Sequence, residues 1–567
     1  MNSVSKNFDE WCSNIFDDNT ISKVKSLKQN NPDDFQDSFY RNLEFGTGGM
    51  RGIMGVGPNR VNKYTFGKTT QGICNFLKSK YNNNEISVVI GHDCRNNGTE
   101  LQEIVCDIFS ANGIKIYKFD SLRPTPLISF AVRELNCNCG IVLTASHNPP
   151  EYNGYKVYWE DGGQIVPPID KKLMLEIENI KYSDIKFDRN FNHIQLLDGT
   201  IDEIFLKKSL SFTESISKKT NSKNLRIVFT PLHGTSYKLL PKILKKSDYK
   251  DLKFVVNQMD PDGNFTNVNS SNPEDPKSLS EAIEIAKKNN SDLVIGTDPD
   301  ADRFGIAVKN FNNDFEHING NQTMVVMTDY LISNYKGKLD NAFIASTVVS
   351  TPMMSKIAEK NNVKIMLSLT GFKWIGKMIE DFEDLNFICG GEESFGFLSG
   401  DFVRDKDAIT SGLIIAEICN ELKNSGLSFF DRLIDCYMKY GFYMEKLVTK
   451  TEKGIKGKIK INDKINGLRE NPPSNLNKSE IVLIYDYDKS LVKNIRTGKL
   501  SKIDLPKSNL MIFESSDGTR VAVRPSGTEP KIKFYFSVNT TLKSKEDFFT
   551  KHKYLNKKIN LLIKQFV

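Results

Sequence analysis

The chain has 567 residues, which is enough for about three to five domains of roughly 100–200 residues each. Its hydrophobic content of 39% and charged content of 26% are ordinary for a globular protein, and no apolar run approaches the roughly 18–20 residues that a membrane span needs. The net charge of +7 is modest for this length, and the basic residues form no concentrated tract. Without a zinc finger or an RNA-binding aromatic motif, the composition gives no reason to expect nucleic acid as a partner.

The N-terminus and the cysteines both bear on localisation. Residues 1–11 lack the apolar core and the small-residue cleavage site of a secretory signal. The nine cysteines are scattered and contain no CxxC pair, a pattern that predicts free thiols in a reducing cytoplasm. We therefore expect a cytoplasmic protein, for which an acidic small substrate such as a sugar phosphate requires only a few local cations.

The first 45 residues show a polar, helical pattern. Their expected inward-facing positions are Trp11, Ile15, Phe16, Ile21, Val24 and Leu27. A loop over residues 45–55 follows, and its glycine content is too high for a helix or a strand.

Beyond this loop, strand and helix patterns alternate. The first block has a strand at 86–91, a helix at 99–111 and a strand at 114–117. A second block begins near Leu225 and a third near Asn341. Alternation of this kind predicts parallel, doubly wound α/β domains.

The C-terminal block has the pattern of an α+β domain. A loop is predicted over residues 463–480, which contain Asn-Pro-Pro-Ser-Asn, and a terminal helix over 545–565. The strands expected in this block are 481–486, 509–514, 519–524 and 531–538. The predicted fold class is therefore α/β, with three doubly wound mixed α/β domains and a C-terminal α+β domain.

Ser146 lies in the segment 144–149, the most informative short stretch of the chain. The apolar run 140–143 before it has the pattern of a buried strand, and the small, polar and proline residues that follow end the strand and open a loop. An exposed serine at a strand end, beside His147, suits a side chain that carries a group better than one that packs. His233 also lies in a site-like loop, whereas the remaining histidines are expected to have structural or surface roles.

The second loop carries three carboxylates at alternating positions, Asp298, Asp300 and Asp302. Crowded like charges are unfavourable unless a cation neutralises them. Hard oxygen ligands suit Mg²⁺, which takes carboxylates together with substrate phosphate oxygens. The alternatives are a solvated turn rich in aspartate, a Ca²⁺ site, and the metal-binding DxD of a glycosyltransferase.

The third loop follows a short apolar strand and carries Glu392, Glu393 and Ser394. Paired carboxylates and a serine at a strand end can bind the hydroxyl groups of a sugar, with a capping box or a turn as the alternative. The cationic side chains in nearby loops are Lys373, Arg404 and Lys406.

The fourth loop lies between two predicted strands. An arginine, two hydroxyls and a glycine that exposes backbone N–H groups have the composition of a phosphate cradle, with a plain β-turn as the alternative. The residues concerned are Arg524, Ser526, Gly527 and Thr528, with Arg520 and Lys533 nearby.

The four loops, each in a separate block, predict a central cleft between domains. In open α/β sheets ligands gather at the carboxyl ends of the strands, where three of these loops fall. The chemistry that the loops suit is phosphoryl transfer with a serine carrier, in which a metal offsets charge on the moving group. A serine hydrolase is disfavoured because the GxSxG elbow is absent.

With these motifs, the chain resembles the α-D-phosphohexomutase superfamily, the phosphoglucomutase/phosphomannomutase group. All four family motifs are present in family order, and the similarity spans nearly the full length. The segments 44–52 and 59–62 resemble the longer bacterial phosphoglucomutase branch. The four domains expected are 1–205 with the phosphoserine loop, 206–320 with the metal loop, 321–440 with the sugar-binding loop and 441–567 with the phosphate-binding loop.

The resemblance also implies roles for individual residues. Ser146 would be the phosphoserine, and Lys156 the proton-transfer candidate, while His147 and Arg51 match other active-site positions. The expected Mg²⁺ ligands are Ser146, Asp298, Asp300 and Asp302. The expected substrate contacts are Arg303, Thr370, Gly371, Lys373, Glu392, Ser394, Arg404 and Lys406. The phosphate group that is not transferred would be held by Arg524, Ser526, Gly527 and Thr528.

The activity implied is the interconversion of α-D-glucose 1-phosphate and glucose 6-phosphate, with glucose 1,6-bisphosphate as intermediate and activator. The alternatives are a phosphomannomutase or phosphopentomutase of the same superfamily and a non-catalytic sugar-phosphate-binding protein. Some relatives carry a histidine just after the sugar loop, but this chain continues Ser394-Phe-Gly-Phe and lacks that proton-transfer candidate. The partners expected are small sugar phosphates, without nucleic acid or membrane, for a protein that acts as a monomer or homodimer.

Overall fold

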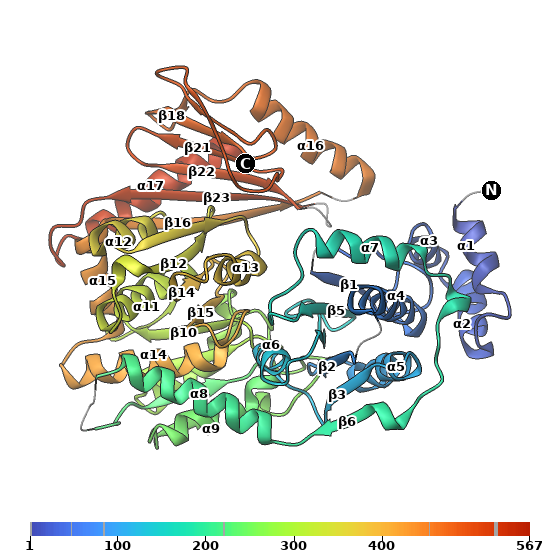
Figure 1. Ribbon diagram of the computed structural model, residues 1–567. Coiled ribbons are helices and arrows are strands. Elements are labelled where there is room, and N and C mark those ends of the chain that lie inside the picture. The colour runs from blue at the N-terminus through green and yellow to red at the C-terminus, as the bar shows by residue number, and fades with distance from the viewer. Residues whose placement is uncertain (1–2, 47, 83–84, 219–221, 453, 527–530) are drawn as a thin grey trace. The chain divides into compact units, whose positions relative to one another are not determined.

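The computed structural model describes the chain except for residues 1–2, 47, 83–84, 219–221, 453 and 527–530 (Figure 1). The described residues divide into two compact units. One comprises Met1–Asn319, Phe372–Phe387 and Ser394–Gly426, and the other comprises Gly320–Gly371, Ile388–Glu393 and Leu427–Val567. Neither unit is therefore a continuous stretch of sequence.

Helices open the first unit, as predicted. They are α1 (Ser3–Trp11), α2 (Asp18–Asn30) and α3 (Pro32–Phe39). The expected inward residues that are buried or half-buried in the small core beneath them are Trp11, Phe16, Ile21, Val24 and Leu27. The prediction for Ile15 is wrong, since its side chain is 41% exposed. Ile15 lies in the turn between α1 and α2, where the period of a helix does not apply.

The first sheet of this unit has the strand order β1-β5-β4-β2-β3-β6. Its strands are β1 (Gly49–Ile53), β2 (Ser87–His92), β3 (Lys115–Phe119), β4 (Cys139–Leu143), β5 (Tyr152–Trp159) and β6 (Ile194–Leu197). The loop predicted over 45–55 is wrong for residues 49–53, which form β1 by pairing with β5 despite their glycines. Its helices are α4 (Lys63–Tyr81), α5 (Gly98–Ala111), α6 (Thr125–Glu134) and α7 (Ile169–Asn179). Strand β5 runs antiparallel to both neighbours, whereas β4, β2, β3 and β6 are parallel. The carboxyl ends of β2 and β4 therefore meet at one edge.

Helices cover both faces of this sheet (Figure 1). Alternate strand residues such as Val88, Ile141 and Val157 enter the main core together with residues of α4, α5 and α7. Helix α6 packs on β2 and β4 from the other face. It approaches so closely that a Cβ on Gly140 would lie 2.5 Å from Val132 Cγ2. Glycine at that position lets helix and sheet pack in contact.

The second sheet of the first unit has the order β11-β10-β9-β7-β8. Its strands are β7 (Ile227–Thr230), β8 (Leu252–Phe254), β9 (Leu293–Thr297), β10 (Phe304–Lys309) and β11 (Phe315–Ile318). The remaining elements of the unit are α8 (Thr200–Ile216), α9 (Leu239–Lys246), α10 (Ser280–Lys288), α13 (Lys373–Asp381), β15 (Phe397–Ser399) and α14 (Ala408–Asn424). Strands β9 and β10 are antiparallel with Thr297 opposite Phe304, so residues 298–303 form the tight loop between them.

The second unit begins with an α/β layer in the strand order β13-β12-β14. Its elements are α11 (Gly320–Asn334), β12 (Ala342–Thr347), α12 (Met353–Asn361), β13 (Lys364–Ser368), β14 (Asn386–Gly391, of which this unit holds the part from Ile388) and α15 (Phe429–Tyr440). Strands β12 and β13 are parallel. A capping box begins α15, because Ser428 accepts from the Asp431 N–H while the Asp431 carboxylate accepts from the Ser428 N–H.

The unit ends with an antiparallel sheet in the order β16-β23-β22-β21-β18-β19-β20, with β17 paired to β18. Its strands are β16 (Phe442–Thr451), β17 (Asn475–Leu476), β18 (Ser479–Asp486), β19 (Leu491–Asn494), β20 (Leu500–Lys502), β21 (Met511–Ser515), β22 (Arg520–Pro525) and β23 (Lys531–Thr540). Helices α16 (Gly454–Glu470) and α17 (Phe548–Phe566) pack on it. The loop predicted over 463–480 is wrong for its first part, where α16 continues with Ile461 and Ile465 buried one turn apart.

The predicted α/β fold class is confirmed by these helix-flanked sheets and the separate C-terminal sheet. The division at 205, 320 and 440 stays a prediction. The nine cysteines are free, as expected. None of the helices in the described part of the chain combines the length and the apolar character needed to cross a bilayer.

Candidate active site

Ser146 sits in a strained turn directly after β4. Its φ of +54° lies in the left-handed region, which is uncommon for a residue with a side chain. The turn is held by the Ser146 N–H, which donates to Thr144 Oγ1 at 2.8 Å. The prediction that the serine is exposed is wrong, since it is 2% exposed. Its hydroxyl donates to Asp298 Oδ2 at 3.1 Å, and its Oγ lies 3.2 Å from His147 Nδ1.

Arg95 holds the backbone of this loop, a role that the sequence analysis missed. Its guanidinium donates to the carbonyl oxygens of Ser146, Asn148, Pro149 and Tyr152. Asp93 accepts the Arg95 backbone N–H at 2.9 Å, and burial raises the pKa of Asp93 to about 6. Polar residues at 93–95, directly after the buried strand β2, were a signal that could have revealed the pair.

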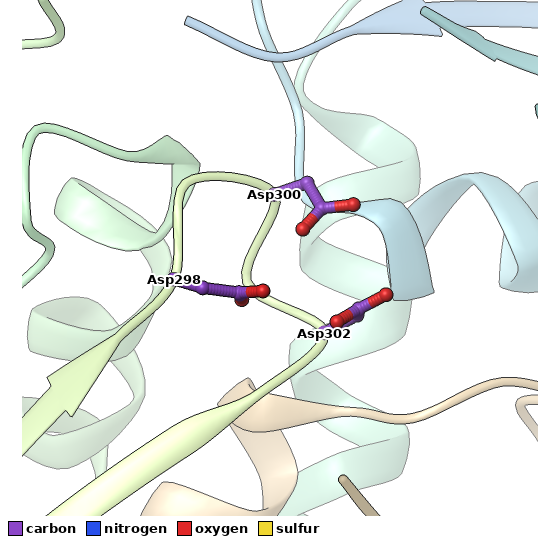
Figure 2. A group of neighbouring side chains, drawn as sticks. All are labelled: Asp298, Asp300 and Asp302. Atoms are coloured by element: carbon purple, nitrogen blue, oxygen red, sulfur yellow. The ribbon is translucent and has the colours of Figure 1, made fainter. Parts of the chain in front are cut away.

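The three aspartates of the loop between β9 and β10 converge, as Figure 2 shows. One carboxylate oxygen from each of Asp298, Asp300 and Asp302 lies within 4.8 Å of the others, and all three residues are buried. The loop is tight because Asp298 Oδ1 accepts the Arg303 N–H at 3.0 Å. Burial, and then the charges of Asp302 and Asp300, raise the pKa of Asp298 well above its usual range.

Two lysines approach this loop. Lys156 Nζ donates to Asp300 Oδ2 at 2.7 Å and to Asp302 Oδ2 at 2.9 Å, and Lys406 Nζ lies 3.2 Å from Asp302 Oδ2. Burial opposes ionisation of Asp302, but Lys156 and Lys406 hold its pKa well below the usual range. Burial likewise opposes the charge of Lys156, but Asp300 and Asp302 outweigh it and raise the Lys156 pKa.

The loop also fits a divalent metal. Asp300 Oδ1 and Asp302 Oδ1 are buried and have no hydrogen-bond partner within the described residues. A buried carboxylate oxygen without a hydrogen bond is costly. In the described part of the chain Asp302 Oδ1 has only a 3.8 Å ion pair with Arg303 Nε, and two such oxygens beside a third aspartate form the oxygen donor set that Mg²⁺ or Ca²⁺ prefers. The lysines occupy only the Oδ2 atoms of Asp300 and Asp302.

His147 is paired with the arginine of the same loop. Arg303 Nη1 donates to His147 Nδ1 at 3.0 Å and to Glu274 Oε1 at 3.0 Å. Because a guanidinium only donates, Nδ1 must accept, so the ring is neutral with its proton on Nε2. Burial, followed by the charges of Arg303 and Arg51, holds the His147 pKa well below its usual range.

Arg51 reaches the site from β1, where it lies opposite Gly154 of β5. Gly49 lies opposite Lys156 in the same ladder, so the pairing of β1 with β5 positions Arg51 and Lys156 together. His233 has a structural role, because its Nδ1 lies 2.7 Å from the Asp260 carbonyl oxygen and its Nε2 accepts the Asn267 N–H.

Three further predicted residues belong to the first unit. Lys373 is 9% exposed, its Nζ has no hydrogen-bond partner within the described residues, and burial lowers its pKa against the pull of Asp170. Arg404 is buried and donates to the carbonyl oxygen of Asp401. Ser394 is half-buried.

The second unit holds a separate group of predicted residues. Glu392 Oε1 accepts the Gly371 N–H at 2.8 Å, which brings the third predicted loop together with the Thr370–Gly371 turn. The neighbouring Glu393 accepts from Ser350 Oγ at 2.9 Å.

The described residues of the fourth predicted loop belong to this unit as well. Arg524 is half-buried on β22, and the Ser526 N–H donates to the Lys531 carbonyl at 2.8 Å. Gly527 and Thr528 lie outside the described residues. Burial and then Glu393 raise the pKa of Tyr535, while Arg524 opposes them, so this unpredicted residue lies near both loops.

Comparisons with known proteins agree with this fold. Residues 42–184, 205–312 and 319–437 match the family descriptions "Phosphoglucomutase/phosphomannomutase, alpha/beta/alpha domain I", domain II and domain III. A protein named phosphoglucomutase from Staphylococcus aureus (strain MRSA252) is 37% identical over 508 residues, which cover 89% of this chain and 91% of that protein.

Two solved structures show the same fold. One is the open form of the Paramecium exocytosis-sensitive phosphoprotein pp63/parafusin, with a TM-score of 0.68, 19% identity and coverage of 93% of this chain and 96% of that one. The other is a putative phosphomannomutase from Thermus thermophilus, with a TM-score of 0.66, 19% identity and coverage of 88% and 96%.

The fold and the sequence matches define a phosphohexomutase scaffold of three α/β/α domains and a further C-terminal domain. The chain belongs to the phosphoglucomutase/phosphomannomutase family of the α-D-phosphohexomutase superfamily.

Proposed function

We propose that the protein interconverts α-D-glucose 1-phosphate and glucose 6-phosphate, with Ser146 as the carrier of the phosphoryl group and glucose 1,6-bisphosphate as the intermediate. The family and the similarity to a phosphoglucomutase support a mutase. The observation that carries the proposal is the Ser146 hydroxyl, which lies 3.1 Å from Asp298 Oδ2 at the edge of the aspartate loop. A phosphoryl group on this oxygen would lie next to that loop.

The surroundings of Ser146 favour a carrier over a hydrolase nucleophile. A hydrolase serine needs a histidine that takes its proton. His147 Nδ1, the ring nitrogen that faces Ser146, already accepts from Arg303, and burial and the nearby guanidinium groups keep the ring neutral. The same arginine and histidine are suited to contact the oxygens of a phosphoryl group.

Asp298, Asp300 and Asp302 are the residues that would hold Mg²⁺, together with an oxygen on Ser146. When bound, the ion offsets negative charge on the phosphoryl group. The Arg303 N–H to Asp298 Oδ1 bond closes the aspartate loop, and the burial of residues 298–302 restrains it further. A rigid donor set keeps the carboxylates in place while the charge of the phosphoryl group moves.

The first half-reaction moves the group from Ser146 to the sugar. The bond from phosphorus to Ser146 Oγ breaks while a bond to the sugar O6 forms, and the O6 proton passes to a neighbouring base. After the bisphosphate has reoriented, the second half-reaction breaks the bond from phosphorus to the sugar O1 and forms the bond to Ser146 Oγ again, while the serine proton passes to a neighbouring base and O1 takes up a proton. Lys156, the proton-transfer candidate, is suited in its ammonium form to donate a proton to an oxygen that leaves the phosphoryl group.

The remaining predicted residues would bind the sugar phosphate. Glu392 and Ser394 are proposed to contact sugar hydroxyls, and the choice of glucose rests on them and on the name of the relative. The other proposed substrate contacts are Arg303, Thr370, Gly371, Lys373, Arg404 and Lys406, while Arg51 and His147 are proposed to act in catalysis. The non-transferring phosphate would be held by Arg524, Ser526, Gly527 and Thr528.

A substrate panel tests the proposed sugar. Glucose, mannose, glucosamine and ribose 1-phosphates are compared by kcat/KM, with and without Mg²⁺ and glucose 1,6-bisphosphate. We expect glucose 1-phosphate to be preferred and both additions to be required for full turnover. A preference for ribose 1-phosphate would assign the protein to the phosphopentomutases instead.

Intact-mass analysis tests the carrier. Incubation with glucose 1,6-bisphosphate is expected to add one phosphate group to the wild type and none to Ser146→Ala, which should retain sugar-phosphate binding. Ser215→Ala, at an exposed position of α8, is the control and should behave as wild type. Substantial turnover by Ser146→Ala would rule out this serine as the carrier.

A further inference from the structure

Asp405 is a buried carboxylate, 1% exposed, between two residues that are expected to bind substrate. Its Oδ1 accepts from the backbone N–H of Lys406 at 2.8 Å and from Lys406 Nζ at 3.0 Å. Its Oδ2 accepts from the Tyr158 hydroxyl at 2.6 Å and from Gln164 Nε2 at 2.8 Å. One oxygen therefore holds the lysine, while the other is fixed by Tyr158 of β5 and by Gln164 beyond the end of that strand.

Tyr158 and Gln164, the two donors to Asp405 Oδ2, also contact each other. Gln164 Nε2 also lies 3.2 Å from the Tyr158 hydroxyl oxygen, and the backbones of Tyr158 and Gln164 form an antiparallel bridge. Tyr158 is fully buried on β5. Because two donors meet one carboxylate oxygen, rotation of the Asp405 carboxylate would break both bonds at once.

Further contacts fix Lys406 itself. Its Nζ lies 3.2 Å from Asp302 Oδ2 and 5.2 Å from the ring centroid of Phe372. Its stem runs over Gly396, where a Cβ would lie 2.1 Å from Lys406 Cδ. The ammonium is thus directed at the aspartate loop along a path that a side chain at Gly396 would obstruct.

The charges explain why Lys406 needs Asp405. Lys156 and Lys406 share one oxygen, Asp302 Oδ2, at 2.9 and 3.2 Å, so two ammonium groups lie close together in a buried region. Like charges at such a distance repel strongly where water is excluded. Asp405 adds a second carboxylate for Lys406. Burial opposes its ionisation, but Lys406 prevails and the pKa of Asp405 is lowered, so the carboxylate is charged.

We propose that Asp405, clamped by Tyr158 and Gln164, is a positioning residue that holds the Lys406 ammonium against Asp302 for phosphoryl transfer. The proposal rests on the proposed function, in which charge shifts near the aspartate loop during each half-reaction. A cation fixed there in advance stabilises that charge without reorganising. Without Asp405, repulsion from Lys156 would move the Lys406 ammonium away from Asp302.

A double-mutant cycle between Asp405 and Lys406 tests this proposal. Asp405→Asn keeps the shape of the side chain but removes its charge, and we expect kcat to fall about 10- to 100-fold with a smaller change in KM. In a Lys406→Met background the same substitution should change kcat less than about threefold, because the residue through which Asp405 acts is gone. Asp405→Glu should restore part of the loss. Equal factors in both backgrounds would overturn the proposal.

A milder pair of variants uses the tyrosines of β5. Tyr158→Phe removes one bond to Asp405, and Tyr155→Phe removes a buried hydroxyl of the same strand that bonds to Thr70 instead. We expect a lower kcat for Tyr158→Phe alone. Equal kcat values for the two variants would count against the clamp even if Asp405→Asn failed to fold.

A measurement without turnover separates this proposal from the proposed function. Reductive methylation of Lys406, followed by peptide mass spectrometry, should be at least about threefold faster in Tyr158→Phe than in wild type and Tyr155→Phe, because a released ammonium is easier to reach. Equal labelling rates would refute the clamp. If labelling follows the prediction but the wild type turns over no hexose phosphate, the proposed function fails and the clamp remains.

Discussion

Arg95→Lys should disturb the loop that carries Ser146 while leaving the charge at position 95 unchanged. The guanidinium donates to four backbone carbonyls between Ser146 and Tyr152. Hydrogen bonds to charged groups contribute about 1.5–3 kcal/mol each, and a lysine, with its donors on a single nitrogen, would lose at least two of the four. Some of the released carbonyls would regain water, because Pro149 is exposed. We therefore expect the domain to lose about 3 kcal/mol of stability.

Differential scanning calorimetry and turnover measure this effect together. For a domain of roughly 150–250 residues, such as the predicted domain 1–205, a loss of about 3 kcal/mol lowers the melting temperature by about 6–12 °C. A displacement of Ser146 by about 1 Å would in addition lower kcat about 100-fold. Arg226→Lys is the control, because the Arg226 side chain is 33% exposed and pairs with Asp292 at the surface. That variant should change stability by no more than about 1 kcal/mol. If Arg95→Lys matched the control in both measurements, the assigned role of Arg95 would be refuted.

Three other predictions concern a glycine, the metal and a helix cap. Gly49→Ala should lower stability by at least about 2 kcal/mol. The φ of Gly49 is +149°, and the new Cβ would lie 2.0 Å from the Tyr155 carbonyl oxygen. Gly199→Ala, at a position with open space around it, is the control and should not lower stability by this amount. Removal of the metal by a chelator should abolish turnover. Mg²⁺ should raise the melting temperature of the wild type but not of Asp298→Asn, and an equal rise in both would exclude the aspartate loop as the metal site. The pKa of Asp407 is raised to about 6 by burial, so between about pH 4 and 6 the folded state keeps a proton that the unfolded chain has released, and its stability falls as pH rises. Asp407 caps α14, because its Oδ1 accepts from the Ile409 and Thr410 N–H groups, and Asp407→Asn keeps that oxygen. The variant should therefore gain stability relative to wild type by about 2–3 kcal/mol between pH 4 and 7, and a difference that does not vary with pH would contradict the raised pKa.

The fold was predictable where local pattern and packing agree. The buried runs of β2, β4 and β9 each consist of consecutive apolar residues, and the structure places them inside sheets covered by helices. Ile15 was mispredicted because the helical period was extended through a turn. The loop predicted at 463–480 began too early because the sequence of α16 is mostly polar and only a few of its residues, such as Ile465, are buried. The Pro-Pro pair after Glu470 does end the helix.

The candidate site was likewise predictable only in part: residues in short local motifs could be recognised, whereas residues that come together from distant parts of the chain could not. Ser146 and the three aspartates are recognisable because each stands in a short motif at a strand end, where the type of residue already indicates the chemistry. The side chains that position such groups come from elsewhere in the chain. Arg95 is 51 residues from the Ser146 carbonyl that it holds, and Tyr158 is 247 residues from Asp405, the carboxylate that holds Lys406. Nothing near Asp405 distinguishes it from an ordinary aspartate in a turn.

The role of Asp405 arises only when the chain folds. Folding brings Tyr158 of β5 to Asp405 Oδ2 and brings the aspartate loop to Lys406, the residue next to Asp405. A motif thus identifies the groups that meet the substrate, because their chemistry is local. The groups that orient these substrate-contacting residues need only lie at the right distance and angle, so residues of many types, from many parts of the chain, can fill that role. For the same reason a variant at Arg95 or Asp405 tests the structure more directly than one at Ser146, whose importance the sequence alone already predicts.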